Sequence, residues 1–239
     1  TQPTTTTQAA SHPASVPTRP EFAPVVRCGL PKGGHVALTF DDGPYRGRGQ
    51  TRRILAILRR AHVKATFFVL GRLARRYPDL LRHIHDEGHL IANHSWDHPR
   101  RQTRAGWISQ LTRTERAIRA AGVAPSRYYR PPHGITNTLV RRVCAKLGYT
   151  IVLYTLLSSD WRRPGVAPLV RQVTRRLHDG GIVVLHDGGG NRTQTIEALP
   201  GIIQGLRARG LEPVRLDRLL EGGAKRRGCA KRRDRTPKR

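Results

Sequence analysis

The feature that most limits the fold is a repeated alternation of short apolar runs with amphipathic segments of helical period. The apolar runs predict seven β-strands, at residues 35–40, 65–70, 89–92, 127–130, 149–154, 181–186 and 212–216. The amphipathic segments predict six helices, at residues 51–61, 73–87, 105–121, 137–147, 167–177 and 194–209. Strands that alternate with helices favour an α/β fold with a parallel sheet, either open or closed into a barrel.

Glycines support the predicted ends of several helices. A residue in the left-handed conformation commonly ends a helix, and glycine adopts that conformation without steric cost. Glycines stand in this position, just before a predicted strand, at Gly88, Gly122, Gly148, Gly180 and Gly210. We therefore expect each of these helices to turn directly into the strand that follows it.

Both ends of the chain are poor in residues that could form a core. Residues 1–26 are dominated by Thr, Pro, Ser and Ala, and they predict a disordered linker. Residues 222–239 form a basic segment that predicts a disordered tail. The folded domain is expected to span residues 27–221.

The formal net charge is +28. Such a charge favours polyanionic partners, including nucleic acid, anionic membranes and the phosphate-bearing polymers of a cell wall. A GC-rich genome would produce the same excess of arginine, and the charge says nothing about catalysis. No apolar run approaches the ~18 residues that span a bilayer. The chain begins at Thr1 and contains no Met, so we expect a processed product whose signal or anchor would lie upstream.

Polar side chains follow the ends of the predicted strands in one element after another. They are Asp41 and Asp42, His94 and His98, Arg130, Asp160, and His186. Because the carboxyl ends of parallel strands meet at one edge of the sheet, these residues are expected to converge there.

Two histidines and one aspartate have the chemistry of a metal site. His94 and His98 are four residues apart, and on one helical turn their imidazoles would share a face. With Asp42 they supply two nitrogens and one oxygen, which leaves open positions as in catalytic zinc sites. The neighbouring Asp41 would then point elsewhere and act as a base. The alternative is structural, because Asp-Gly-Pro is also good turn chemistry.

The other polar candidates have structural alternatives of the same kind. His186 would ordinarily be a structural histidine, but the glycines after it indicate an open loop. Trp161 fits either a core position or a surface on which a sugar ring stacks. Arg130 would be a costly buried cation unless it pairs with a carboxylate. The two prolines after Arg130 stiffen the loop and leave the amide of His133 free to donate.

Together these residues resemble the polysaccharide deacetylases of carbohydrate esterase family 4, the NodB homology domain. Five family motifs are matched in order, by TFDDGP (39–44), HSWDH (94–98), RPPHG (130–134), SSDW (158–161) and VLH (184–186). The sequence departs from the family at three positions. Leu157 replaces the first Asp of the fourth motif, Val184 replaces the Leu of the fifth, and His133 replaces a frequent Tyr of the third.

The resemblance implies a distorted (β/α) barrel with about seven parallel strands, and it favours the barrel over an open sheet. It also implies a hydrolase that removes N-acetyl groups from a polysaccharide containing N-acetylglucosamine, such as peptidoglycan, a chitin-like polymer or poly-N-acetylglucosamine. Asp42, His94 and His98 would bind one divalent metal ion. Zinc is expected, with cobalt, nickel or manganese as alternatives.

The resemblance also assigns the catalytic roles. Asp41 would accept the proton of a water, and Arg130 would pair with Asp41 and favour its ionised form. His186 would protonate the departing sugar nitrogen, and Asp160 would orient or charge that histidine.

Three further residues would bind substrate by the same resemblance. The amide of His133 would stabilise the oxyanion, Trp161 would form one wall of a groove open to the polymer, and Val184 would line a pocket for the acetyl methyl group. The side-chain change at His133 is tolerable if this position acts through its backbone.

Two other functions stay open. Removal of O-acetyl groups, as from acetylxylan, would use the same fold and ligands. A catalytically idle module that binds the cell wall or a polyanion would explain the charge, although the complete ligand set opposes it. The expected partners are an acetylated polysaccharide and anionic wall polymers, with no specific nucleic acid. We expect a monomer that is secreted or cell-wall-associated, outside the cytoplasm, with an upstream membrane tether left open.

The three cysteines are too far apart in sequence for a zinc ribbon or a CxxC motif. One disulfide and one buried thiol would suit a secreted protein, whereas three free thiols is the alternative. In a closed barrel the first and last elements are neighbours, so Cys28 and Cys229 are expected to pair across the seam. Cys144 lies on an amphipathic helix and is expected to point into the core.

Overall fold

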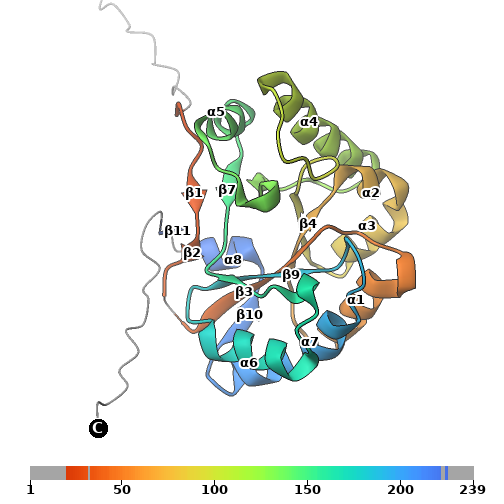
Figure 1. Ribbon diagram of the computed structural model, residues 1–239, viewed down its shortest axis with the longest axis vertical. Helices are drawn as coiled ribbons and strands as arrows, with labels where there is room; N and C mark the ends of the chain where they lie inside the picture. The colour runs from red at the N-terminus through yellow and green to blue at the C-terminus, as the bar shows by residue number, and fades with distance from the viewer. Residues whose placement is uncertain (1–19, 32, 222–223, 226–239) are drawn as a thin grey trace, which may run out of the picture.

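The computed structural model describes residues 20–31, 33–221 and 224–225. Its centre is a nine-stranded sheet in the order β1-β7-β6-β5-β4-β3-β9-β8, with β10 also paired to β3 (Figure 1). Every pairing in this sheet is parallel. The strands are β1 (Val25–Val26), β3 (His35–Asp41), β4 (Thr66–Val69), β5 (Leu90–Asn93), β6 (Tyr128–Tyr129), β7 (Thr150–Val152), β8 (Leu156–Leu157), β9 (Ile182–His186) and β10 (Glu212–Val214).

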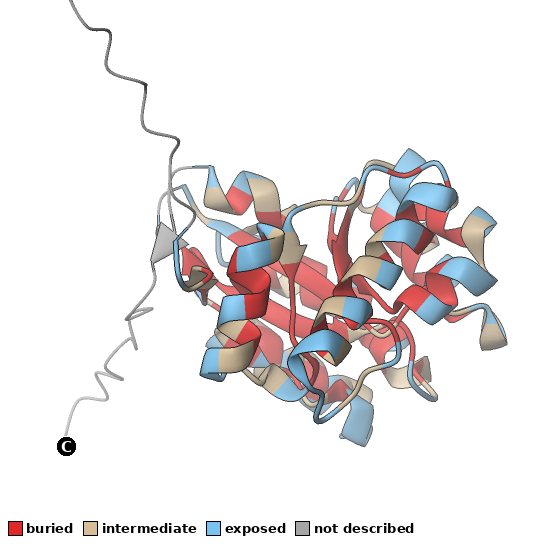
Figure 2. Cartoon of the chain, turned by 90° about the horizontal axis from the view of Figure 1, so that it is seen from above, coloured by how far each residue is buried: buried red, intermediate tan, exposed pale blue. Residues whose placement is uncertain are grey.

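Helices surround the sheet, with their exposed residues on the outer side and their buried residues toward the strands (Figure 2). They are α1 (Gln50–Arg60), α2 (Gly71–Arg76), α3 (Pro78–Asp86), α4 (Arg104–Ala120), α5 (Thr138–Leu147), α6 (Val166–Arg176), α7 (Thr193–Arg207) and α8 (Leu216–Leu220). No helix in the described part of the chain is long and apolar enough to cross a membrane.

The predicted fold, a distorted (β/α) barrel, is confirmed. All seven predicted strands are present, and the two-residue strands β1 and β8 extend the sheet. No pairing joins β8 to β1 in the described residues, so the barrel is open along that line. The five glycines predicted to end helices all have positive φ.

Two predicted elements have different boundaries in the structure. The helix expected at 73–87 is divided into α2 and α3 at Tyr77, whose backbone is non-helical (φ −130°, ψ 58°). Pro78 explains the break, because proline disfavours helical geometry in the residue before it. The strand expected at 212–216 ends at Val214, and the short helix α8 follows.

The ordered domain extends slightly beyond the predicted boundaries of 27 and 221. Val25 and Val26 form β1 and pair with β7, so they belong to the sheet rather than to a linker. Cys28–Gly29 forms β2, which pairs antiparallel with β11 (Ala224–Lys225). Ala23 of the predicted linker is also buried, and its amide donates to the carbonyl of Arg141 at 3.1 Å. Residues 1–19 of the predicted linker and residues 222–223 and 226–239 of the predicted tail lie outside the described residues.

Side chains inside the barrel form an apolar layer beneath a polar one. Strand side chains alternate between the two faces of the sheet, so residues two apart on a strand point the same way. The apolar layer combines strand residues with two leucines of α8 that close this end of the barrel: Ala37, Phe68, Ala92, Val152, Ile182, Leu216 and Leu219. Above Ala37 follow Thr39 and Asp41, and above Ile182 follow Val184 and His186. The fold thereby directs these residues toward the carboxyl edge of the barrel.

The cysteines agree with the expected pairing as far as the structure describes them. β10 pairs with β3, so the first and last major strands are neighbours, as the expected pairing of Cys28 with Cys229 assumes. Cys28 is disulfide-bonded, and Cys144 is a buried free thiol. Cys229 lies outside the described residues, so its bond to Cys28 stays a prediction.

Peptide mapping without reduction tests this pairing. We predict a peptide that joins Cys28 to Cys229 and a single alkylatable thiol at Cys144 in the unfolded protein. The bond would close a loop of about 200 residues and would stabilise the fold by on the order of 5 kcal/mol in the loop-entropy model. A Cys28→Ser variant should therefore unfold at a lower denaturant concentration. A peptide joining Cys144 to either other cysteine would refute the pairing.

Candidate active site

The predicted site residues converge at the carboxyl edge of the barrel. Asp41 is the last residue of β3 and Asp42 follows it, while His94 directly follows β5. Arg130 directly follows β6, and His186 is the last residue of β9. Four chain segments that are distant in sequence thus deliver charged or titratable groups to one place.

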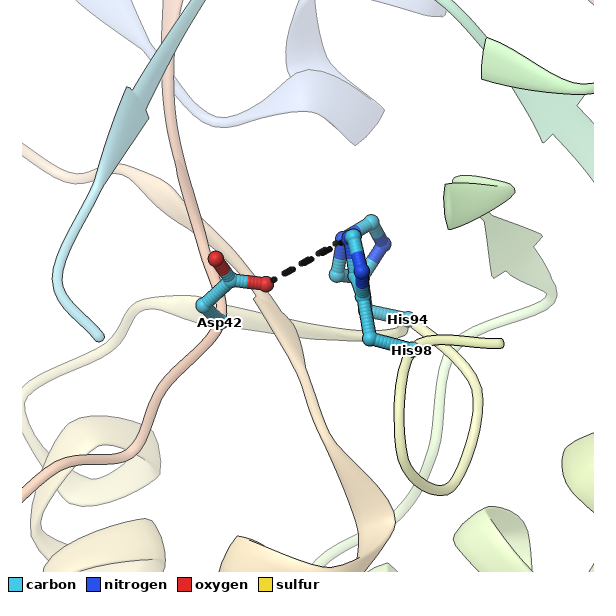
Figure 3. A group of neighbouring side chains, drawn as sticks. All are labelled: Asp42, His94 and His98. Atoms are coloured by element: carbon cyan, nitrogen blue, oxygen red, sulfur yellow. Dashed lines mark ion pairs between the residues drawn. The ribbon is translucent and has the colours of Figure 1, made fainter. Parts of the chain in front are cut away.

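Asp42, His94 and His98 form the group that could hold a metal ion, with ligand atoms that all lie within 4.8 Å of one another (Figure 3). The Oδ1 atom of Asp42 is 3.6 Å from Nε2 of His94 and 3.7 Å from Nε2 of His98. This oxygen is buried and has no hydrogen-bond partner within the described chain. An unpartnered carboxylate oxygen facing two imidazole nitrogens fits a divalent ion such as zinc.

The tautomer of His94 is fixed by a backbone contact. Nδ1 of His94 lies 2.7 Å from the carbonyl oxygen of Arg130, and because a carbonyl only accepts, Nδ1 must donate. The lone pair of neutral His94 is therefore on Nε2, the nitrogen that faces Asp42. Such a bond to the second ring nitrogen is typical of metal-ligating histidines.

Electrostatics keeps the other two ligands in their metal-binding forms. Burial, reinforced by the neighbouring His94, lowers the pKa of His98 to about 4, so its imidazole is neutral at pH 7. Burial alone would raise the pKa of Asp42, but His94, His186 and His98 pull it below its usual value. A neutral imidazole and an ionised carboxylate are the states in which these side chains bind metals.

The segment that carries both histidines is a loop, and the expectation that His94 and His98 lie on one helical turn is wrong. Ser95 has φ 73° and His98 has φ 66°, which are incompatible with a right-handed helix. The hydroxyl of Ser95 accepts a hydrogen bond from the amide of His98 at 3.2 Å. The loop therefore folds back on itself, and this brings the two imidazoles to 5.1 Å between ring centroids.

Two buried amide side chains hold this loop in place, and the sequence analysis missed both. Asn93 accepts a hydrogen bond from the amide of Ser95 at 2.8 Å. Gln110, on α4, accepts hydrogen bonds from the amides of Trp96 and Asp97, at 2.7 and 3.2 Å. Gln110 is a polar residue on the inner face of the predicted helix at 105–121, and this position could have indicated that it holds a neighbouring loop.

The candidate base is held by a buried arginine. Nη1 of Arg130 lies 2.7 Å from Oδ1 of Asp41, and both side chains are buried. The same nitrogen donates to the hydroxyl of Thr39 at 2.7 Å, and the guanidinium lies 4.0 Å from the ring centre of Phe68. The predicted pairing of Arg130 with Asp41 is thus present in the structure, and the carboxylate compensates the buried cation.

The candidate acid has its own carboxylate. Nδ1 of His186 lies 2.6 Å from Oδ1 of Asp160, and Oδ2 of Asp160 accepts hydrogen bonds from the His186 amide and the Thr195 hydroxyl. Burial lowers the pKa of His186, but Asp160, Asp41 and Asp42 outweigh it and raise the pKa above its usual value. Thr195 was not predicted, because nothing in the sequence marks a threonine on a helix as a partner of Asp160.

The three predicted substrate-binding residues differ in how accessible they are to a ligand. The amide of His133 makes no hydrogen bond in the described chain, and its residue has φ 57°. Trp161 is 47% exposed and directly follows Asp160. Val184 lies on the same face of β9 as His186, but it is only 2% exposed. His133 and Trp161 are therefore available to a ligand in this structure, whereas Val184 is covered.

A sequence model of the polysaccharide deacetylases matches residues 29–152. The chain belongs to this family. It is 34% identical over 197 residues to a chitooligosaccharide deacetylase of Azorhizobium caulinodans, which covers 75% of the chain and 92% of that relative. It is also 34% identical over 188 residues to a peptidoglycan-N-acetylglucosamine deacetylase of Bacillus cereus, with 77% and 87% covered. The expected membership in carbohydrate esterase family 4 is thus confirmed.

Solved structures of this esterase family have the same fold. A family 4 carbohydrate esterase from Streptomyces lividans in complex with acetate superposes with a TM-score of 0.70 at 38% identity, covering 75% of this chain and 91% of that one. A family 4 pseudoenzyme from Bacillus anthracis superposes with a TM-score of 0.76 at 30% identity, covering 84% and 70%. This deacetylase fold therefore occurs with and without activity, and the site residues must decide between the two.

Metal analysis of purified variants tests the division between ligand and base. His98→Ala should lose the metal while its circular dichroism is unchanged, because a loop ligand contributes little to the core. Asp41→Asn should keep about one metal ion per chain, since the carboxylate of Asp41 is paired with Arg130. Loss of metal in Asp41→Asn together with full occupancy in Asp42→Asn would reverse the two assignments.

Proposed function

We propose that the chain is a metal-dependent hydrolase that removes N-acetyl groups from a polysaccharide containing N-acetylglucosamine. The observation that carries this proposal is the presence of two ion pairs beside the candidate metal-binding group. On one side Arg130 holds Asp41, and on the other Asp160 holds His186. Hydrolysis of an amide needs both a base and an acid, because an amine is a poor leaving group until it is protonated.

Asp42, His94 and His98 would hold one divalent ion, which when bound acidifies a water and polarises an acetyl carbonyl. The two nitrogens and one oxygen of this set favour zinc. Asp41 accepts the proton of the attacking water. Its Oδ1 is engaged by Arg130, and its Oδ2 lies 3.9 Å from Nε2 of His94, so Oδ2 is the oxygen that faces the ligand group.

The developing charges are met by two other groups. The unpaired amide of His133 donates to the oxyanion, and its left-handed backbone holds the N–H in place before substrate arrives. Nδ1 of His186 is engaged by Asp160, so Nε2 carries the proton that is delivered to the departing sugar nitrogen. Trp161 offers an exposed aromatic face on which a neighbouring sugar can stack.

The substrate and location follow from the relatives. Curated relatives of this chain are named for chitooligosaccharides and for peptidoglycan, both of which contain N-acetylglucosamine. A polymer of this kind lies outside the cytoplasm, so we propose a secreted or wall-associated enzyme. The net charge of +28 would attract it to anionic wall polymers. Each catalytic group comes from this one chain, so we propose that it acts as a monomer.

A panel of polymers tests the proposed function. We predict that the zinc-loaded protein releases acetate from peptidoglycan, chitin oligomers or poly-N-acetylglucosamine and leaves free amines on the product. Asp41→Asn, which keeps its metal, is the matched inactive control. Release from acetylxylan alone would assign the enzyme to esters, and no release from any polymer by the metal-loaded protein would indicate an idle module.

The pH dependence tests the acid. His186 must be protonated to act, so the rate on an amide should fall as pH rises through the raised pKa of His186. Asp160→Asn removes the charge that raises this pKa and leaves the burial that lowers it. The alkaline limb should then move to lower pH, by about one unit or more. Asp217→Asn, which removes a carboxylate from α8, is the control and should leave the limb in place.

The same variants separate amide from ester chemistry. An ester leaving group departs without prior protonation more readily than an amine does, so His186→Ala should impair an amide more than a chemically matched ester. Equal losses on the two substrates would contradict the role of His186 as the acid.

A further inference from the structure

A cavity of about 400 Å³ lies between α2, α3 and α4, away from the proposed catalytic groups. Its floor is formed mainly by alanines, and three guanidinium groups line it: Arg75 on α2, and Arg113 and Arg116 on α4. The lining contains none of the proposed ligands, base or acid. Trp96, which belongs to the loop between His94 and His98, forms part of the wall.

The three arginines are not compensated by carboxylates. Some surface arginines of this protein pair with acids, as Arg119 does with Glu115 and Arg207 with Glu212. No ion pair to Arg75, Arg113 or Arg116 occurs within the part of the chain that the structure describes. Three uncompensated cations around one cavity produce a positive potential that an anion would relieve.

Trp96 organises two of these cations. The guanidinium carbon of Arg113 lies 4.1 Å from the indole ring centre, and that of Arg75 lies 4.9 Å from it. The indole is held between α2 and α4, where a Cβ on Gly71 would come within 2.6 Å of it. Because the ring is buried and packed against Gly71, the stacked arginines are partly ordered before any ligand binds, which reduces the entropic cost of binding.

We infer that this cavity binds a phosphodiester group of an anionic, polyol-phosphate wall polymer. The N–H groups of a guanidinium match the oxygens of a phosphate. Three guanidinium groups offer more hydrogen-bond donors than the two oxygens of a single carboxylate can accept. The alanine floor suits the carbon chain between two phosphates. The inference rests on the proposed function, since a wall polysaccharide would be found beside such a polymer. Binding there would hold the enzyme near its substrate and raise the effective substrate concentration.

Calorimetric titration of the zinc-loaded protein with a short synthetic glycerol-phosphate oligomer tests the inference. The triple variant Arg75→Gln/Arg113→Gln/Arg116→Gln should bind at least about 10-fold more weakly and show a smaller dependence on salt. The matched control is Arg171→Gln/Arg175→Gln/Arg176→Gln, which removes the same charge from exposed positions on α6. Its affinity should change by less than about twofold.

Three results would overturn the inference. Equal losses of affinity in the two triple variants would show diffuse attraction to the net charge. Equal binding of polyglutamate would remove the preference for phosphate, and equal binding of inorganic phosphate would remove the preference for a polymer. Arg116→Gln alone, which leaves both arginines stacked on Trp96, should still weaken binding if the triple variant misfolds. An unchanged affinity in that variant would also count against the site.

The binding assay is independent of turnover. Acetate release from a soluble chitin oligomer should be the same in wild type and in both triple variants, because none of the six arginines belongs to the catalytic site. Selective binding without any acetate release would contradict the proposed function and support the phosphate site. Acetate release without selective binding would support the proposed function and contradict the phosphate site.

Discussion

The buried ion pair between Arg130 and Asp41 is the interaction on which the site depends. The guanidinium stands on the apolar layer of the barrel, against Phe68, and donates to Asp41, Thr39 and the carbonyl of Leu153. It thereby joins β3 to the chain after β7 across the interior of an open barrel. Removing one partner of such a buried pair typically costs about 3–5 kcal/mol, because the other charge remains without compensation. The proposed base and the barrel are therefore stabilised by the same contact.

Arg130 also reaches the metal-binding group through its backbone. Its carbonyl oxygen accepts the Nδ1 proton of His94, which turns Nε2 toward Asp42. The side chain of one residue thus holds the proposed base, and its main chain sets the tautomer of a proposed ligand. The short strand β6 positions both groups, because it ends just before Arg130. A shift of this strand would disturb the two functions together.

Much of the fold could be predicted from the sequence, because it follows from local periodicity. The seven strands and the helices were found, and the shared carboxyl edge brought the right side chains together. The break at Tyr77 is signalled by Pro78 and not by periodicity, and the path of the His94–His98 loop could not be found from either. That path depends on two buried amides, Asn93 just before the loop and Gln110 on α4, and on left-handed backbone that periodicity does not reveal.

The strained backbone is concentrated at the site. Non-glycine residues with positive φ include five in its loops: Asp42, Ser95, His98, His133 and Ser159. Each such residue is held against its local preference by surrounding contacts, at a cost of about 1–3 kcal/mol in sparsely populated regions. The burial and hydrogen bonds of neighbouring groups must offset that cost. Here local sequence preference and final structure disagree, and the residues concerned are those that a ligand would meet.

The carboxylates of Asp41 and Asp160 differ because their partners differ. Asp41 faces an arginine, which stays charged at any physiological pH and cannot exchange a proton with it. Asp160 faces a histidine, whose pKa it raises while its own is lowered by the same bond. In the first pairing the carboxylate can only accept a proton from a group outside the pair. The second pairing favours the imidazolium form of His186, which can donate a proton. With the residue types at positions 130 and 186 exchanged, neither a free base nor a proton donor would remain. The proposed division between base and acid therefore follows from which cation each carboxylate meets.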